Sequence, residues 1–188
     1  MFVSVALPAA LLHGQPQTSG TPGPNQSAAE KYFTDTLLLD QDGKEHRFYT
    51  DLVKGKVVVI SPMFATCKDS CPVMAANLAR IQKWLGPRLG NEVLLLSISV
   101  DPETDTSPVL KQYAARFNAQ PGWYFLTGKK DNVESILKKL GLYVEQKQDH
   151  LSLFLIGNDR TGLWKKALGV SDSAKLIEVV QSVLQDKQ

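Results

Sequence analysis

Four runs of consecutive apolar residues constrain the fold of this chain more than any other feature. They are KVVVIS (56–61), EVLLLSISV (92–100), WYFLTG (123–128) and LSLFLIG (151–157). A continuous β-branched run without polar alternation is typical of a strand that is buried on both faces. We therefore expect a central sheet whose two faces are both covered by helices.

Helix-type spacing follows each of the first three runs and closes the chain. Apolar spacing indicates the first and last helices, through Met74, Leu78, Ile81 and Leu85, and through Leu176, Ile177, Val180, Val183 and Leu184. Start signals indicate the two helices between them: Ser107 and Pro108 open one that ends near Asn118, and Asp131 and Glu134 open one that ends near Gly141. Apolar residues three and four apart share one face of a helix. Ser-Pro and the Asp…Glu pair are helix-start signals.

Two hairpins complete the pattern. The first is TLLLDQDGKEHRFY (36–49), around the turn dipeptide Asp42-Gly43, and the second joins the fourth strand through NDRTG (158–162) to LWKKALG (163–169). Strands that alternate with helices predict parallel pairing. The order predicts an α/β, thioredoxin-like fold: a central, mostly parallel sheet flanked by helices, with an N-terminal β-hairpin extension.

The 188 residues divide into three predicted parts. Residues 1–13 are an apolar leader, which we interpret as signal-like or as a clipped anchor, although no Lys or Arg precedes its apolar stretch. Residues 14–30, rich in Pro, Gly and small polar residues, are a predicted flexible linker. Residues 31–188 form one predicted domain. We expect an exported or membrane-anchored, extracytoplasmic (periplasmic) protein.

The charge balance argues against a nucleic-acid partner. The formal net charge is +2, and no run of Lys and Arg is interleaved with aromatic residues. Phosphate binding requires several clustered cations.

Both cysteines, Cys67 and Cys71, lie in FATCKDSCPV (64–73), directly after the first buried strand. A structural disulfide framework would space cysteines far apart, so this close pair indicates redox or metal chemistry. Pro72 suits the first helical position, which predicts that Cys71 is the N-cap. The helix start and Lys68 should both favour the thiolate.

His150 is the candidate third ligand, because it directly precedes the fourth strand and a thioredoxin-like plan brings that segment beside the first helix. We expect His13 and His46 to be solvated surface residues. Two thiolates and an imidazole form a soft, low-coordinate set that suits Cu(I) and can hold Cu(II), whereas zinc would prefer a fourth ligand. Asp149 is a weaker candidate for orienting the imidazole.

The chain from about residue 33 to 169 resembles the SCO/SenC family of copper-binding assembly proteins. The resemblance rests on four stretches in matching order: FATCKDSCP, SVDPETDTSPVLKQYAARF, FLTG and DHLSLFLIG. This chain departs from the family pattern in having Lys68 after the first cysteine, Pro108 one place late, and Leu151 after the histidine. None of these departures removes a ligand, but Lys68 changes the charge beside Cys67.

The resemblance implies a function. Cys67, Cys71 and His150 would bind copper, and the protein would be a metallochaperone that delivers copper to, or matures, the Cu(A) site of a respiratory cytochrome c oxidase subunit. Another copper chaperone would be a second partner, and a tether would hold the protein at a membrane. On this interpretation the protein is not an enzyme, although a redox-active Cys67–Cys71 pair could carry accessory thiol-disulfide oxidoreductase activity.

Other interpretations stay open at this point. The alternative function is a thiol-disulfide oxidoreductase that reduces cysteines of an oxidase subunit or another exported protein, and a redox or copper sensor is a third. A peroxidase is disfavoured because Thr66 abuts Cys67. We expect Asp101 and Asp105 to accept loop and helix-start N–H groups. The remaining residues considered are expected to be core or rim residues: Met63, Met74, Trp84, Trp123 and Trp164.

Overall fold

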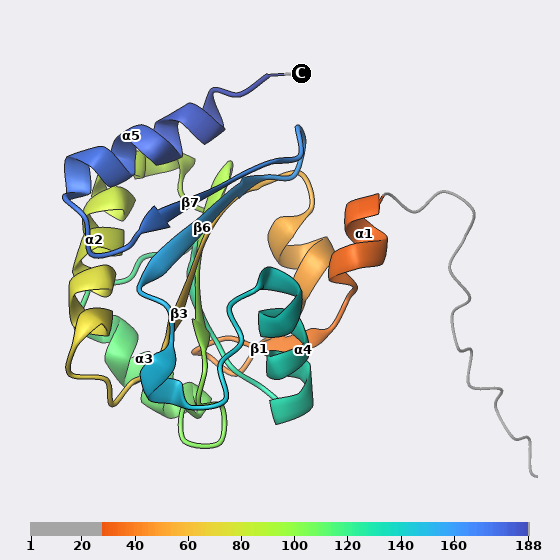
Figure 1. Cartoon of the computed structure of the whole chain (residues 1–188), viewed down its shortest axis with the longest axis vertical. Helices are drawn as coiled ribbons and strands as arrows, with labels where there is room; N and C mark the ends of the chain where they lie inside the picture. The colour runs from red at the N-terminus through yellow and green to blue at the C-terminus, as the bar shows by residue number, and fades with distance from the viewer. Residues whose placement is uncertain (1–27, 188) are drawn as a thin grey trace, which may run out of the picture.

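The computed structural model describes residues 28–187, in which a five-stranded sheet lies between two layers of helices (Figure 1). The strands are β3 (Val57–Met63), β4 (Val93–Ser99), β5 (Trp123–Leu126), β6 (Leu153–Asn158) and β7 (Leu163–Leu168). Their order is β5-β4-β3-β6-β7, and within this sheet β6 runs opposite to the other four strands. This confirms the predicted mostly parallel sheet with a closing antiparallel hairpin.

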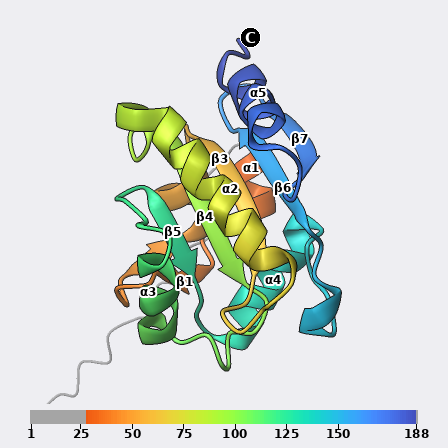
Figure 2. The same ribbon diagram turned by 90° about the vertical axis from the view of Figure 1, so that its left-hand side faces the viewer.

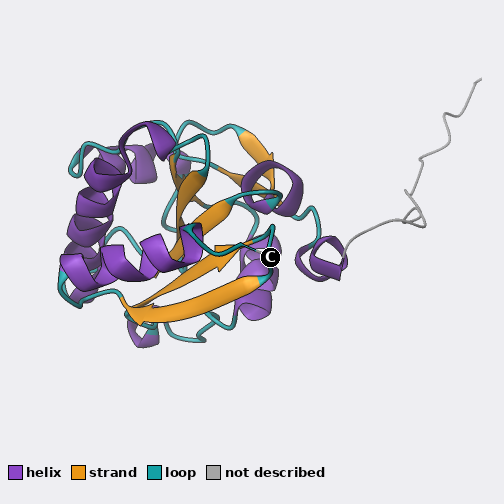
Figure 3. Ribbon diagram, turned by 90° about the horizontal axis from the view of Figure 1, so that it is seen from above, coloured by secondary structure: helices purple, strands orange, loops and turns teal. Residues whose placement is uncertain are grey.

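Helices cover both faces of the sheet (Figures 2 and 3). One face carries α2 (Ser70–Leu85), α3 (Ser107–Ala115) and α5 (Ser173–Leu184). The other carries α1 (Ala28–Phe33), the π-helix η1 (Phe48–Val53) and α4 (Lys130–Leu140). A short 3-10 helix, η2 (Gly86–Arg88), follows α2.

The alternating direction of strand side chains explains the two apolar layers. In β3, Val57 and Val59 belong to the layer under α2, while Val58 and Ile60 belong to the layer under α4. All four of these side chains are fully buried. The uninterrupted apolar run of β3 therefore follows from its position in the centre of a sheet with no solvent-facing side.

At the N-terminal end, β1 (Leu37–Leu39) and β2 (Glu45–Arg47) pair antiparallel as a separate two-stranded sheet. Main-chain hydrogen bonds of 2.8 Å in both directions join Leu39 to Thr127, just after β5. The predicted leader (1–13) and most of the predicted linker (14–30) lie outside the described residues; the last three linker residues are the start of α1. Among the helices of residues 28–187, none is long and apolar enough to cross a bilayer.

His46, predicted to be a solvated surface residue, is buried. It pairs with Leu38 across the two-stranded sheet, and 6% of its surface is exposed. Its Nε2 lies 2.8 Å from Oδ2 of the buried Asp40, and its ring centroid lies 5.1 Å from that of Tyr124. The prediction was wrong because a carboxylate partner makes burial of an imidazole favourable, and periodicity does not show that partner.

The antiparallel pairing of β3 with β6 determines which loops meet. Ile60 pairs with Leu155, so the carboxyl end of β3 lies beside the amino end of β6. The loop after β3 contains Cys67, and the segment before β6 contains the 3-10 helix η3 (Lys147–Asp149) and His150. Two stretches far apart in the sequence are therefore held at the same end of the sheet.

Candidate metal centre

Three side chains that could ligate a metal ion converge at this end of the sheet. One ligand atom each from Cys67, Cys71 and His150 lies within 4.8 Å of the other two. Sγ of Cys71 lies 3.1 Å from Nε2 of His150. Both cysteines are buried free thiols, with 8% of Cys67 and 1% of Cys71 exposed.

The local structure around the cysteines differs from the prediction in one respect. Helix α2 begins at Ser70, with Asp69 as its N-cap, so Cys71 is the second residue of the helix and not its N-cap. Pro72 is the third helical residue. Proline is tolerated there because the N–H groups of the first turn have no partner within the helix, so a missing N–H costs no helical hydrogen bond.

The predicted preference for the thiolate form is also wrong for Cys71 in the metal-free site. Burial, and then the hydrogen-bonded thiol of Cys67, raise the pKa of Cys71 well above its ordinary value. These effects outweigh the positive end of the helix. Cys71 therefore keeps its proton until a metal ion or an oxidant displaces it.

Hydrogen bonds fix the direction of the His150 ring. Its Nδ1 lies 3.0 Å from the main-chain oxygen of Lys147, and a carbonyl can only accept, so Nδ1 carries the proton. Nε2 then presents its lone pair to the Cys71 thiol and, at 3.4 Å, to the Ser70 hydroxyl. Burial lowers the pKa of His150, which favours the neutral, ligating form. The side chain of Asp149, expected as a weak candidate for this role, is exposed.

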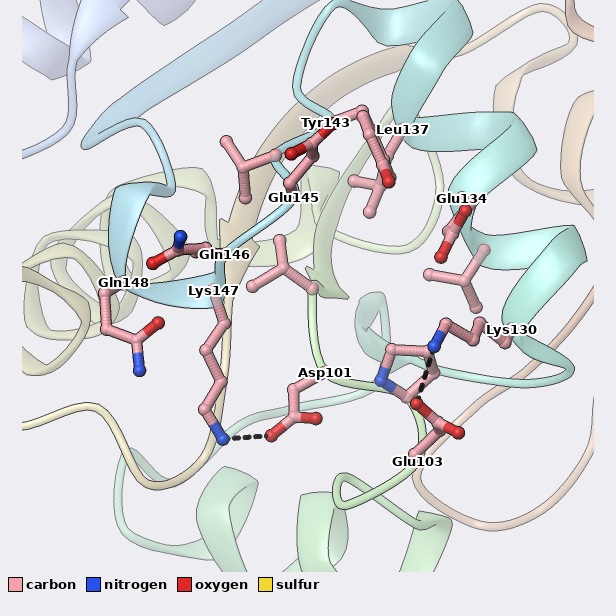
Figure 4. Close-up of a pocket in the computed structure, with 14 residues that line it drawn as sticks. Asp101, Glu103, Lys130, Glu134, Leu137, Tyr143, Glu145, Gln146, Lys147 and Gln148 are labelled. Carbon is pink, nitrogen blue, oxygen red and sulfur yellow. Dashed lines mark hydrogen bonds and ion pairs between the residues drawn. The ribbon is translucent and has the colours of Figure 1, made fainter.

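Two residues that the sequence reasoning missed support the imidazole. The ring of Phe64 meets that of His150 edge-on, with centroids 5.3 Å apart. Lys147 Nζ lies 5.4 Å from the Phe64 centroid and 2.6 Å from Oδ2 of Asp101 (Figure 4). The available signals were the position of Phe64 at the strand exit and that of Lys147 three residues before His150.

Asp105 holds the cysteine loop through hydrogen bonds to its main chain. The side chain is fully buried; both carboxylate oxygens accept from the N–H of Ala65, at 3.1 and 3.2 Å, and one accepts from the Ser99 hydroxyl at 2.6 Å. This matches the expectation that the carboxylate accepts loop N–H groups. Asp101 instead forms the ion pair with Lys147.

The other residues considered are core or rim residues, as expected. Met63 and Met74 are buried, and Trp123 is fully buried. Trp84 and Trp164 are half-buried and pack against the core. The candidate centre therefore consists of two sulfurs and one imidazole nitrogen.

This donor set fits a soft ion. Two ligands that share one ion at about 2.0–2.3 Å lie at most about 4.6 Å apart, so the observed spacing requires little movement. Thiolates and imidazole suit copper. The adjacent thiols offer dithiol–disulfide chemistry as well.

Comparisons with known proteins agree with this geometry. A model of the SCO1/SenC family matches residues 24–185. The mitochondrial protein SCO2 of Saccharomyces cerevisiae is 34% identical over 144 residues, which cover 70% of this chain and 46% of that protein. The chain spans about half to two thirds of the length of the first curated relatives that it matches.

Two solved structures share the fold. Yeast Sco1, crystallised with copper bound, superimposes with a TM-score of 0.66 at 27% identity, covering 81% of this chain and 92% of that one. BsSco, a member of the Sco family of cytochrome c oxidase assembly proteins in which a disulfide switch was identified, gives 0.66 at 30% identity, covering 82% and 94%.

Proposed function

Because the chain belongs to the SCO1/SenC family, we propose that it is a copper-binding metallochaperone in the assembly of a respiratory cytochrome c oxidase. The observation that carries the proposal is the meeting of Cys67, Cys71 and His150, whose ligand atoms lie within 4.8 Å of one another. Yeast Sco1 binds copper within the same fold. Copper is the cargo of this site, and the three side chains are its ligands.

The chemistry of the site supports capture followed by release. Two sulfurs and one nitrogen satisfy Cu(I) without closing a four-coordinate shell, so an incoming ligand from a partner can join before one of these three leaves. His150 is the most exposed of the three ligands. We therefore expect copper to leave through exchange at His150 first.

The finer proposal concerns the recipient. BsSco is described as belonging to the cytochrome c oxidase assembly proteins, and we propose that this chain delivers copper to, or matures, the Cu(A) site of an oxidase subunit. We further propose an extracytoplasmic, periplasmic location, reached by export or by an anchor in residues 1–13. Residues 14–30 would then tether the domain.

Copper titration tests the ligand set. Reduced protein should bind Cu(I) at 1:1 in competition with a chelator, and Cys67→Ser, Cys71→Ser and His150→Ala should each weaken the complex by at least about tenfold. His13→Ala in the full chain is the matched histidine control and should leave affinity unchanged. Equal affinity with and without His150 would remove it from the ligand set.

Transfer tests the delivery role. A purified, copper-free Cu(A) domain should gain its characteristic absorption faster from the copper-loaded protein than from an equal concentration of a copper–chelator complex. No difference between the two donors would contradict delivery.

A second function is favoured by one observation: Cys67 and Cys71 are free thiols whose sulfur atoms lie within 4.8 Å of each other. A thiol-disulfide oxidoreductase would reduce a disulfide of its target while forming the Cys67–Cys71 disulfide. Its signature is turnover of a target disulfide that needs both cysteines and survives His150→Ala. Negligible exchange with the oxidised Cu(A) domain would exclude this function.

A further inference from the structure

A cavity of about 390 Å³ lies beside the candidate metal centre, between the loop after β4, helix α4 and residues 143–148 (Figure 4). Its wall contains two lysine–carboxylate ion pairs. Lys147 reaches Asp101 at 2.6 Å, and Lys130 reaches Glu103 at 2.8 Å. The two pairs differ in burial: the side chains of the first are 34% and 15% exposed, those of the second 54% and 71%.

Lys147 contacts His150 directly through its main chain and indirectly, across the ring of Phe64, through its side chain. Its carbonyl oxygen accepts from Nδ1 of His150 at 3.0 Å and from the His150 main-chain N–H at 3.4 Å. Its ammonium group lies over Phe64, the same ring that meets the His150 imidazole edge-on. Lys147 therefore joins the ring of His150 to groups outside the ligand set.

The other end of this connection is fixed to the sheet. Asp101 follows β4, and its main-chain N–H donates to the Ser99 hydroxyl at 2.9 Å. That hydroxyl in turn donates to Asp105, which holds the cysteine loop through Ala65. The ion pair thus ties the short turn of η3 to the same anchor that holds the cysteines.

We propose that Lys147 is a positioning residue for His150, and that its ion pair with Asp101 latches the η3 turn so that Nε2 of the imidazole faces the two sulfurs. The inference rests on the proposed copper-binding function. It concerns Lys147 and Asp101, which line the cavity beside the site, and not the three candidate ligands.

The physical reason lies in the two tautomers of a neutral imidazole. The nitrogen that binds metal must carry no proton, and the hydrogen bond made by the other nitrogen decides where the proton sits. While the carbonyl of Lys147 accepts from Nδ1, Nε2 is free to ligate. If the turn moves away, the ring loses this partner, and part of the population places the proton on Nε2.

The first test uses the metal-free protein, so its result does not depend on copper. Nitrogen-15 NMR of the His150 ring should show a protonated Nδ1 in the unaltered chain and a mixture of tautomers in Lys147→Gln and Asp101→Asn. Lys147→Arg keeps the cation and should keep the tautomer. Lys130→Gln removes the other ion pair of the same cavity and is the matched control.

Cu(I) affinity is the second test. Lys147→Gln and Asp101→Asn should each weaken binding by about threefold to tenfold, with Lys147→Arg and Lys130→Gln near the unaltered value. Because both substitutions break the same Lys147–Asp101 ion pair, the double variant should lose no more Cu(I) affinity than the weaker-binding single variant does. Additive losses would overturn the latch, as would an unchanged tautomer in Lys147→Gln.

The two proposals fail differently. If His150→Ala binds Cu(I) as tightly as the unaltered chain does, the proposed ligand set is wrong. The tautomer of His150 in the metal-free protein then still decides whether Lys147 positions the ring. If the unaltered chain binds copper as proposed and Lys147→Gln retains both tautomer and affinity, the positioning role alone is wrong.

Discussion

The carboxylate of Asp105 accepts the main-chain N–H of Ala65 in a partly buried contact, with both carboxylate oxygens within 3.2 Å of the nitrogen. Ala65 lies two residues before Cys67, and Asp105 lies two residues before α3. This contact fastens the cysteine loop to a neighbouring loop of the sheet without occupying a ligand position.

Removing this carboxylate should destabilise the fold. Asp105→Ala leaves the partly buried N–H of Ala65 and the buried hydroxyl of Ser99 without their acceptor, which should lower the free energy of unfolding by about 2–3 kcal/mol. Urea unfolding of the metal-free protein measures the loss. Asp42→Asn, which breaks an exposed ion pair with Lys111, is the control and should change stability by less than about 0.5 kcal/mol.

The same side chain should leave a signature in the pH dependence of stability. Burial raises the pKa of Asp105 above its ordinary 3.8, so the folded state binds this proton more tightly than the unfolded state. The protonated carboxyl group adds stability that is fully present below the pKa of the unfolded chain. This stability is lost as the pH rises through the higher pKa of the folded protein. The advantage of the unaltered chain over Asp105→Asn should therefore shrink from about pH 4 upward. Urea unfolding at stepped pH measures it, and an advantage that grows with pH would contradict the assignment.

The buried His46–Asp40 pair in the two-stranded N-terminal sheet leads to a further prediction. His46→Ala leaves a carboxylate that is 4% exposed without its cation-capable partner, at an expected cost of about 3 kcal/mol in the free energy of unfolding. Glu45→Ala, at the exposed neighbouring position in β2, should change stability by less than about 0.5 kcal/mol. Similar effects of the two substitutions in thermal or urea unfolding would show that the pair is unimportant.

Gly157 makes room for a tryptophan on the adjacent strand. It pairs with Trp164 across β6 and β7, and a Cβ atom at this position would overlap the indole ring. Gly157→Ala should therefore lower the free energy of unfolding by about 2 kcal/mol through overpacking. In a Trp164→Ala background the same substitution should cost much less, because the overlapping ring is gone. An equal cost in both backgrounds would attribute the loss to something other than this contact.

The positions of the strands were predictable from the sequence because burial on both faces leaves a direct signal. Val57 to Ile60 show no polar alternation, and the structure places β3 in the centre of the sheet. The meeting of Cys71 with His150 followed from the order of the elements, since adjacent strands bring their flanking loops together. These features depend on local pattern and topology alone.

The failures concern side chains whose partners lie far along the chain. His46 is polar, so periodicity placed it in solvent, and only the carboxylate of Asp40 explains its burial. Lys147 was missed because its side-chain partner Asp101 lies 46 residues away, and its place three residues before His150 does not reveal that partner. The helix start was misplaced by two residues because Pro72 is compatible with any position in the first turn.

The antiparallel neighbours β3 and β6 have a consequence for the timing of metal capture. As the chain emerges from a ribosome, the Cys71 thiol appears 79 residues before the imidazole that faces it, and the Cys67 thiol appears earlier still. A nascent chain thus exposes reactive sulfur with no complete binding site. Loading must wait until the last hairpin has joined the sheet, so the cell should protect this chain from premature oxidation until synthesis is complete.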